Sequence, residues 1–155
     1  MGIEPTQLRI LVVRPALKAI DLWSQAAENL VMGTAAQESN LRYLHQVKGP
    51  AVGLFQIEPA TYADIWNRYL NDQPVLATKL RKLAGVTEGI PDVNLMAGNL
   101  YFAAAMCRVF YRRLAAPLPA ADDVAALGGY WKKYYNTVKG KGTVAQFVKN
   151  WPLVA

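Results

Sequence analysis

The longest apolar pattern in the sequence runs from Asp92 to about Leu114 and repeats every three or four residues. Asp92 can cap its start, and small residues along it permit close approach by neighbouring helices. Such a pattern predicts one long central helix, around which the rest of the chain must pack. The recurring residues are Ala97, Leu100, Tyr101, Ala104, Cys107 and Phe110.

Shorter helical patterns cover most of the remaining chain. Pro15 is expected to break or restart the first of them, because its ring removes a donor and clashes with the preceding turn. A second helix should start at Asp21 or Ser24 and continue through Glu38. The other expected helices cover Ala60 to Leu70, Pro74 to Ala84 with Gly85 as its end, Asp122 or Asp123 to about Tyr135, and Thr143 to Asn150.

The helical period is lost between Leu41 and Ile57. Gly49-Pro50 and Gly53 punctuate this segment, which predicts a small irregular or hairpin lobe around residues 41–57. At Gly53 the backbone can take positive φ or approach a ligand closely. Gln56 carries both a donor and an acceptor, which suit it to holding sugar hydroxyl or N-acetyl groups.

Composition is consistent with one mainly α domain over residues 1–155. A chain with 53% hydrophobic and 18% charged residues is globular, and at this length it can bury a core without disulfide bonds. Its one cysteine excludes an internal disulfide framework, and Cys107 is expected to be a buried small hydrophobe. No segment approaches the roughly 20 apolar residues of a membrane span. The sequence implies no cofactor and no metal.

The net charge is +6, with 17 basic side chains spread along the chain. This charge favours a polyanionic partner, such as nucleic acid, an anionic membrane or a bacterial wall, without choosing among them. No nucleic-acid-binding motif is present, so nucleic acid is not the expected partner. The start of the chain does not look like a signal peptide, because Arg9 and Arg14 enclose its only apolar run.

Glu38 is the first candidate for a functional residue. At about 100° per residue, Ala27, Val31, Thr34 and Glu38 fall on one stripe of their helix, so Glu38 should face inward. A carboxylate removed from water loses solvation, and its pKa rises. Glu38 is therefore expected to hold a proton near neutral pH, as a general acid must.

The residues that follow resemble a known family. Glu38-Ser39, the string Gly53-Leu54-Phe55-Gln56-Ile57 that begins fifteen residues after Glu38, and then Pro59 and Thr61 resemble the core signature of the soluble lytic transglycosylases. These are lysozyme-like, peptidoglycan-cleaving enzymes related to goose-type lysozyme. Phe55 stands where methionine is usual and keeps an apolar wall. The resemblance implies a lysozyme-like fold, Glu38 as the catalytic acid, and substrate contacts from Ser39, Phe55 and Gln56.

A later motif of the same family places a tyrosine near the catalytic acid. Tyr135-Asn136, followed by Gly140, resembles that motif, although Thr137 stands where alanine is usual. A rival alignment gives the tyrosine's role to Tyr130. We prefer Tyr135 because the helix should end at the motif. The resemblance then implies that Tyr135 and Asn136 also bind substrate.

The resemblance implies a mechanism that needs one carboxylate. Glu38 would donate a proton to the glycosidic oxygen between N-acetylmuramic acid and N-acetylglucosamine. Its carboxylate would then assist attack by the sugar's own 6-hydroxyl and leave a 1,6-anhydro product. Hydrolysis by a muramidase needs a second carboxylate at a set distance. Glu58 is the only acidic residue beside the glutamine turn, and we expect it to point out of the groove.

The expected partner is bacterial peptidoglycan, and the expected state is a monomer. A small basic chain without a signal peptide is typical of phage products, either an endolysin released from the host cytoplasm to the wall or an enzyme carried in the virion. Two other classes stay open. One is a non-catalytic module that binds peptidoglycan or serves as a structural part of the virion. The other is a basic helical nucleic-acid binder.

Overall fold

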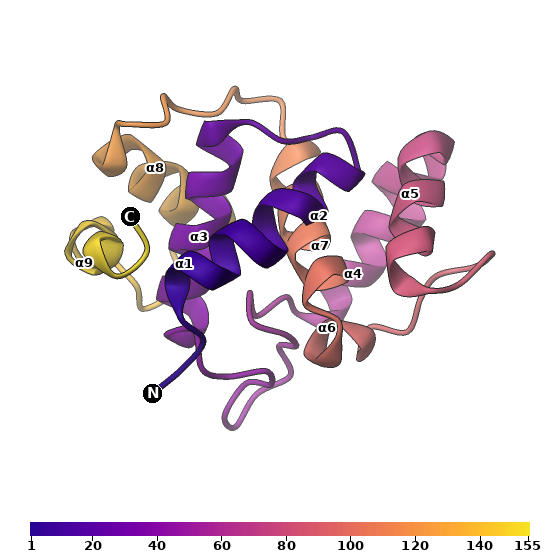
Figure 1. Cartoon of the computed structure of the whole chain (residues 1–155), viewed down its shortest axis with the longest axis horizontal. Coiled ribbons are helices and arrows are strands. Elements are labelled where there is room, and N and C mark those ends of the chain that lie inside the picture. The colour runs from indigo at the N-terminus through magenta and orange to yellow at the C-terminus, as the bar shows by residue number, and fades with distance from the viewer.

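The computed structural model describes residues 1–155, and all of its regular elements are helical (Figure 1). The only β-type pairings are two isolated antiparallel bridges, between His45 and Val52 and between Val52 and Ile57. The prediction of a mainly α fold is therefore confirmed. No helix has the length and apolar character needed to cross a bilayer.

The N-terminal segment is one continuous helical rod, which crosses the front of the molecule in Figure 1. It comprises α1 (Pro5–Gln7), the π-helical turn η1 (Leu8–Val13) and α2 (Arg14–Ala19). Pro15 does not interrupt the rod. The backbone N–H of Arg14 donates to the carbonyl of Arg9, five residues back, so the wider π turn carries the chain past the proline without a break.

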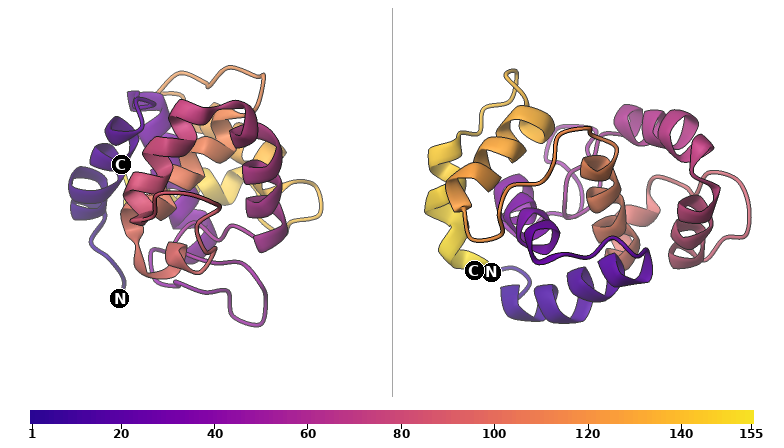
Figure 2. Two further views of the ribbon diagram at one scale, coloured as in Figure 1. Left: turned by 90° about the vertical axis from the view of Figure 1, so that its right-hand side faces the viewer. Right: turned by 90° about the horizontal axis from the view of Figure 1, so that it is seen from above.

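Helix α3 (Gln25–Ser39) runs through the middle of the molecule (Figure 2). The Ser24 side chain accepts the N–H of Ala27 at 3.1 Å and so marks the start, which decides between Ser24 and Asp21. Every residue from Ala27 to Ala36 is buried. Ala27, Val31 and Thr34 of the predicted inward stripe are buried as expected, but neighbours cover the other faces of α3 as well.

The long pattern from Asp92 to Leu114 forms two helices rather than one. A short α6 (Leu95–Gly98) ends at Asn99, and α7 (Leu100–Arg112) begins after it. Asn99 has extended backbone angles, its Oδ1 accepts the N–H of Phe102, and its Nδ2 donates to the carbonyl of Leu83. This cap and tether divide the pattern, and α7 alone is the buried central helix. Cys107 lies in it with no exposed surface, as expected.

The remaining helices lie on either side of α3 and α7 (Figures 1 and 2). On one side are α4 (Pro59–Asp64), its continuations η2 (Ile65–Tyr69) and η3 (Leu70–Asp72), and α5 (Pro74–Ala84). On the other are α8 (Val124–Trp131), the π turn η4 (Lys132–Asn136), α9 (Val144–Asn150) and η5 (Trp151–Leu153). One continuous cluster of 37 buried hydrophobic residues joins both sides, so they share a single core.

The segment between α3 and α4 is an irregular lobe below the helices, as expected for residues 41–57 (Figure 1). Backbone hydrogen bonds join Gln46 to Ala51, Gly53 to Leu44, and Val52 to Ile57. Gly53 has a φ of 83°, and a Cβ there would lie 2.7 Å from the carbonyl oxygen of Met96. Only glycine suits this position, which confirms the positive φ predicted for Gly53, and the close approach is to the Met96 backbone rather than to a ligand.

Candidate functional site

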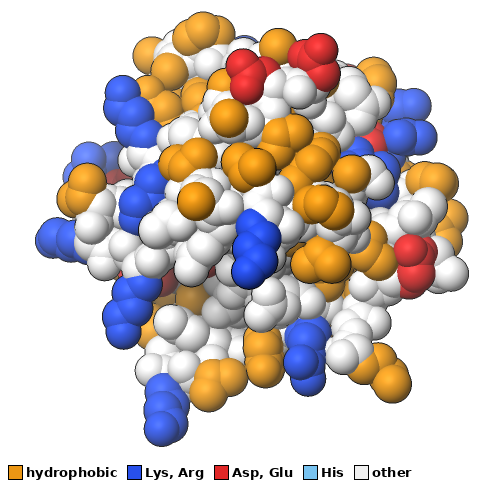
Figure 3. Space-filling model, turned by 90° about the vertical axis from the view of Figure 1, so that its left-hand side faces the viewer, with side chains coloured by type: hydrophobic (Ala, Val, Ile, Leu, Met, Phe, Trp, Pro, Cys, Tyr) orange, Lys and Arg blue, Asp and Glu red, His pale blue; other side chains and the backbone are white.

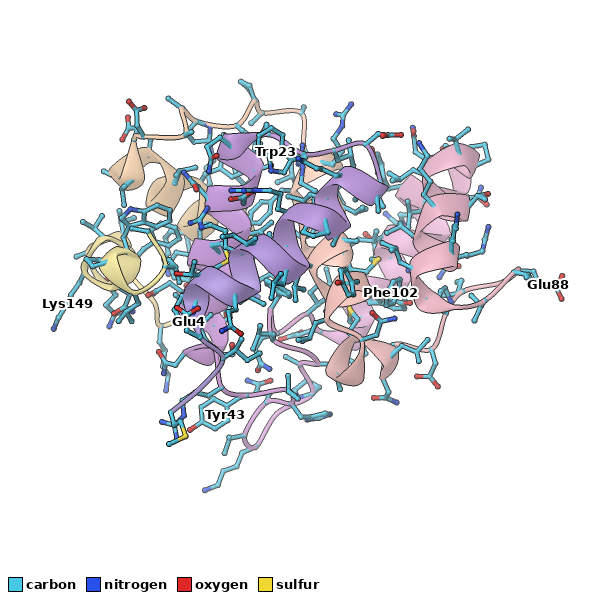
Figure 4. The ribbon with its side chains drawn as sticks, in the orientation of Figure 1. Glu4, Trp23, Tyr43, Glu88, Phe102 and Lys149 are labelled. Carbon is cyan, nitrogen blue, oxygen red and sulfur yellow. The ribbon has the colours of Figure 1, made fainter.

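A cavity of about 920 Å³ opens between the end of α3, the irregular lobe, the end of α7 and the turn η4. Its size lies within the range of ligand-binding pockets. Figure 4 shows Tyr43 on the lobe that forms one side of it. The lining residues are Glu38, Tyr43, Gln46, Val47, Ala51, Gln56, Ile57, Glu58, Thr61, Phe110, Arg113, Tyr134, Tyr135, Asn136, Thr137, Lys139 and Gly140.

Glu38 lies in the last turn of α3, where the helix emerges from the core into the cavity. Burial raises the pKa of its carboxyl to about 7, and a hydrogen bond from Trp131 opposes this rise. The Trp131 Nε1 donates to Glu38 Oε1 at 2.9 Å. A raised pKa is what the sequence predicted. Its cause, however, is the packing of several elements around the end of α3 rather than one apolar stripe.

Trp131 steadies the charged form of Glu38, which gives a direct prediction. In Trp131→Phe the ring is largely kept but the N–H is lost, so the pKa of Glu38 should rise further above about 7. Titration of the Glu38 carboxyl carbon by NMR measures this shift. Trp151→Phe is the matched control, because Trp151 stacks on Phe147 and donates no hydrogen bond to Glu38. An unchanged Glu38 pKa in Trp131→Phe would contradict the role given to the indole N–H.

Tyr135, and not Tyr130, reaches the cavity. The Tyr135 hydroxyl donates to the carbonyl of Phe55 at 2.6 Å, and burial raises its pKa well above the ordinary value. Its ring packs on Phe110 with centroids 4.3 Å apart. The Tyr130 hydroxyl instead donates to the carbonyl of Ala116, on another surface. The structure therefore brings the preferred tyrosine of the two to the site.

Their spacing in the sequence places Trp131 and Tyr135 at one site. Trp131 is the last residue of α8 and Tyr135 lies four residues later in η4, and residues four apart lie on the same face of a helix. One residue thus bonds Glu38 while the other bonds the lobe through Phe55. This turn joins two walls of the cavity.

Gln56 lines the cavity, whereas the side chain of Phe55 does not. Gln56 has a φ of 54°, and its Nε2 donates to the carbonyl of Gly53 at 2.9 Å, which orients the amide. Phe55 is only 1% exposed and belongs to the core. The expectation that Phe55 forms an apolar wall for a ligand is wrong, and its contribution is the backbone carbonyl that accepts from Tyr135.

Ser39 does not reach the cavity either. It is 1% exposed, and its hydroxyl donates to the carbonyl of Ala35 in its own helix. The reason is geometric, since the residue after Glu38 is turned by about 100° and faces the core. Asn136 does line the cavity, and its Oδ1 accepts from Lys132 Nζ at 2.7 Å.

Glu58 is also among the residues that line the cavity, and the direction of its carboxylate stays a prediction. It precedes Pro59 at the start of α4, but its side chain makes no capping hydrogen bond and is exposed. A second carboxylate is thus available at the cavity mouth. The sequence could not give its direction, because that depends on how the lobe meets α4.

The lining residues that the sequence did not identify as site residues include Tyr43, Tyr134 and Arg113. Tyr134 directly precedes Tyr135 of the later motif. Tyr43 lies between Glu38-Ser39 and the string that begins at Gly53. Position in the sequence was therefore only a weak signal for either residue. Arg113 belongs to a basic pair that is ordinarily read as a solvated helix face. Its place in the cavity follows from the end of α7 and not from its neighbours in sequence.

Comparison with protein-family models, curated proteins and solved structures found no match to this chain. No cluster of three or more His, Cys, Asp or Glu side chains has the geometry to hold a metal ion. The site therefore has to be interpreted from its own chemistry. It combines a carboxyl of raised pKa with four aromatic residues, amide groups and basic side chains in one cavity.

Proposed function

We propose that the protein is a lysozyme-like lytic transglycosylase that cleaves the glycan strands of bacterial peptidoglycan. The observation that carries the proposal is Glu38, a carboxyl with a pKa of about 7 in a cavity large enough for a saccharide. The motifs that resemble those of the family add support, because Gln56, Tyr135 and Asn136 line the same cavity from separate segments. No other carboxyl in the protein combines a raised pKa with a place in a cavity.

In the proposed mechanism, Glu38 acts first as an acid and then as a base. Its proton moves to the glycosidic oxygen as the bond from C1 of N-acetylmuramic acid breaks, and positive charge develops at C1. The resulting carboxylate takes the proton of the 6-hydroxyl while that oxygen bonds to C1. The product carries a 1,6-anhydro ring, no water is consumed, and Glu38 regains its proton.

The neighbouring side chains serve this cycle by holding its parts in place. The Trp131 N–H keeps Glu38 Oε1 fixed and stabilises the carboxylate formed after proton transfer. Tyr135 anchors the lobe through the Phe55 carbonyl and so fixes the wall that carries Gln56. The Gln56 amide can then orient sugar hydroxyl or acetamido groups.

Analysis of the products tests the proposed reaction. Purified peptidoglycan digested with the protein and separated for mass spectrometry should yield muropeptides with 1,6-anhydro ends. These are one water lighter than the reducing ends that a hydrolase produces. Muropeptides with reducing ends alone would overturn the transglycosylase assignment and leave a muramidase.

A muramidase is the second candidate, and the placement of Glu58 at the cavity favours it. A second carboxylate can position and activate water, or stabilise C1, if it lies opposite the acid at a suitable distance. Glu58 is exposed and has no hydrogen bond that holds it elsewhere. This arrangement gives water-dependent cleavage a structural basis.

The variant Glu58→Gln separates the two reactions. If Glu38 works alone, the variant should form anhydro products at a rate within about threefold of the wild type, since only a charge at the cavity mouth is lost. A hydrolase that depends on Glu58 would instead lose activity by about 10²-fold or more. The rates at which products with reducing ends and with anhydro ends are formed distinguish these outcomes. The setting, an endolysin or a virion-associated enzyme, stays a prediction from the sequence.

A further inference from the structure

A second, smaller cavity lies between the end of α7, the connection from α7 to α8, and Tyr130 of α8. Figure 1 shows this connection along the top of the molecule. The cavity has a volume of about 190 Å³, which is below the range of pockets that enclose a drug-sized ligand. It suits a small ion or the end group of a larger molecule. Two of its lining residues are arginines of α7, Arg108 and Arg112.

Arg108 is a buried cation whose outer N–H donors have no partner. The side chain belongs to a residue that is only 8% exposed, and its Nε donates to the carbonyl of Leu22 at 2.9 Å. Its terminal nitrogens, Nη1 and Nη2, donate to no acceptor in the protein, and neither is fully enclosed by protein atoms. Since Arg108 lines the cavity, these donors reach solvent there. The bond to Leu22 therefore fixes the guanidinium while its outer edge stays available to a ligand.

No carboxylate balances the charge of Arg108. The ion pairs of the protein involve Arg9, Arg14, Arg68 and Lys79, and neither Arg108 nor Arg112 takes part in one. Arg112 lies four residues after Arg108, on the same face of α7, and adds a second positive charge. Burial and the charge of Arg112 lower the pKa of Arg108, yet an arginine stays charged at neutral pH. Because buried charges are ordinarily paired, this pair of cations points to an anion that binds beside them.

The end of the helix accounts for only one of the two arginines. A basic residue in the last turn of a helix is stabilised by the negative end of the helix dipole, and Arg112 is the last residue of α7. It is exposed and is solvated there without a ligand. Arg108 lies one turn earlier and is buried, beyond the reach of this effect. Its charge therefore depends on the Leu22 carbonyl and on a group that enters the cavity.

The backbone of the connection from α7 to α8 adds further donors. The N–H groups of Ala115 and Ala116, which line the cavity, donate to no acceptor in the protein. The Tyr130 hydroxyl donates to the carbonyl of Ala116 at 2.8 Å, which ties the connection to α8 and occupies an oxygen that would repel an anion. No carboxylate lines this cavity. It thus combines two guanidinium groups with unpaired backbone N–H groups.

We propose that Arg108 and Arg112 bind a phosphate group in this cavity. A phosphate carries up to two negative charges, which match the two guanidinium groups, and its oxygens accept well from the guanidinium fork. The inference goes beyond the proposed function and does not rest on it, because this cavity shares no lining residue with the one that contains Glu38. Free phosphate and the headgroup of an anionic phospholipid offer the same oxygens, so the test includes both.

Titration with inorganic phosphate tests the site for the free ion. NMR spectra recorded at neutral pH, with phosphate replacing chloride at constant ionic strength, should show saturable shifts of the Arg108 and Arg112 side-chain N–H signals. We expect a Kd of about 1 mM or lower. Arg112→Gln should raise the Kd by about tenfold or more, because one of the two charge-assisted contacts is lost. Saturable binding with the same Kd in Arg112→Gln would overturn the proposal.

Two further variants locate the effect. Arg42→Gln is the matched control, since it removes the same charge from an exposed arginine that lines neither cavity, and its Kd should stay within about twofold of the wild type. Arg108→Lys keeps the charge but loses the fork, so binding should weaken by about threefold or more. Melting temperatures show whether each variant is folded. If Arg108→Lys is not, Arg112→Gln decides the matter, because Arg112 is exposed.

Sedimentation with lipid vesicles tests the phospholipid headgroup as the source of the phosphate. Vesicles of phosphatidylglycerol are compared with neutral vesicles of phosphatidylcholine. Binding to phosphatidylglycerol that falls about fivefold or more in Arg112→Gln, but not in Arg42→Gln, would identify the headgroup as the ligand. Equal losses in the two variants, together with saturable binding of inorganic phosphate, would identify the free ion. The absence of both saturable phosphate binding and an Arg112-dependent vesicle interaction would overturn the proposal.

Discussion

Glu38→Gln should abolish cleavage of peptidoglycan while the protein stays folded. Glutamine has nearly the shape of protonated glutamic acid but cannot transfer a proton, so the step at the glycosidic oxygen loses its acid. We expect the rate of anhydro-muropeptide formation to fall by about 10³-fold or more. Clearing zones on a peptidoglycan zymogram, with wild type and variant in adjacent lanes, give the first readout. The amounts of anhydro-muropeptides formed over time give the second readout.

The pH dependence of wild-type activity also tests Glu38 as the acid. Glu38 must be protonated to act, and its pKa of about 7 means that the active form is lost as pH rises through this value. Activity should therefore fall on the alkaline side of about pH 7, with the midpoint set by the carboxyl. An activity that stays constant from pH 6 to pH 9 would rule out Glu38 as the acid.

The free energy of unfolding of Glu38→Gln, compared with that of the wild type, shows whether the variant is folded. Because the folded-state pKa of Glu38 is raised, the folded protein binds a proton more tightly than the unfolded chain, and this contribution is lost as pH rises from about 4.5 through 7. Above pH 7 the wild type keeps a partly buried charge that the variant lacks. The variant should then be more stable by up to about 3 kcal/mol, and this difference should vanish near pH 4.

The zymogram also separates the remaining classes of function. Clearing by Glu38→Gln equal to that of the wild type would sink the acid mechanism. If neither protein clears the gel, a module that binds peptidoglycan without cutting it becomes the better account. Nucleic-acid binding is the least favoured alternative, since the lysines and arginines on the face in Figure 3 are spread among neutral and hydrophobic groups.

Helix content could be predicted from the sequence because its signals are local. Ser24 and Thr143 cap helices by accepting nearby backbone N–H groups, and Gly85 ends α5 with a left-handed backbone, as their residue types indicate. The break at Asn99 was missed because it depends on a tether to Leu83 on another helix. Only the assembled fold supplies that bond.

The candidate site could also be predicted in part from the sequence. Glu38, Gln56 and Tyr135 lie far apart in the sequence, yet the motifs that contain them indicated a shared site, and they do line one cavity. Trp131 was not expected to hold Glu38, because a bond across 93 positions leaves no trace in the local pattern. Ser39 was misplaced for a different reason, since adjacent helical residues face in different directions.

A second large effect is expected far from the cavity, at the buried carboxylate of Glu28 on α3. Its side chain has no exposed surface and accepts hydrogen bonds from Arg9, Arg14 and Trp23 at 2.7 to 2.9 Å. Arg9 also donates to the carbonyl of Val154, so the cluster ties the N-terminal rod to α3 and to the C-terminal residues. Figure 4 shows Trp23 in the connection between α2 and α3.

Glu28→Gln should destabilise the protein by about 3 to 5 kcal/mol, because it leaves the charges of Arg9 and Arg14 without their counter-ion. For a chain of this length the melting temperature should fall by roughly 10 °C. Differential scanning calorimetry at pH 7 measures the loss. Glu88→Gln, in an exposed loop, is the matched control and should change stability by no more than about 0.5 kcal/mol.

The effect of Glu28 should depend on pH in the opposite sense to that of Glu38. Burial by itself would raise the pKa of Glu28, but hydrogen bonds from Arg14, Trp23 and Arg9 outweigh it and lower the pKa to about 2. The stabilisation is therefore present above about pH 4.5 and is lost as pH falls towards 2, so the gap between wild type and Glu28→Gln should narrow in acid. A gap that stayed constant down to pH 2 would show that packing, and not charge, accounts for the loss.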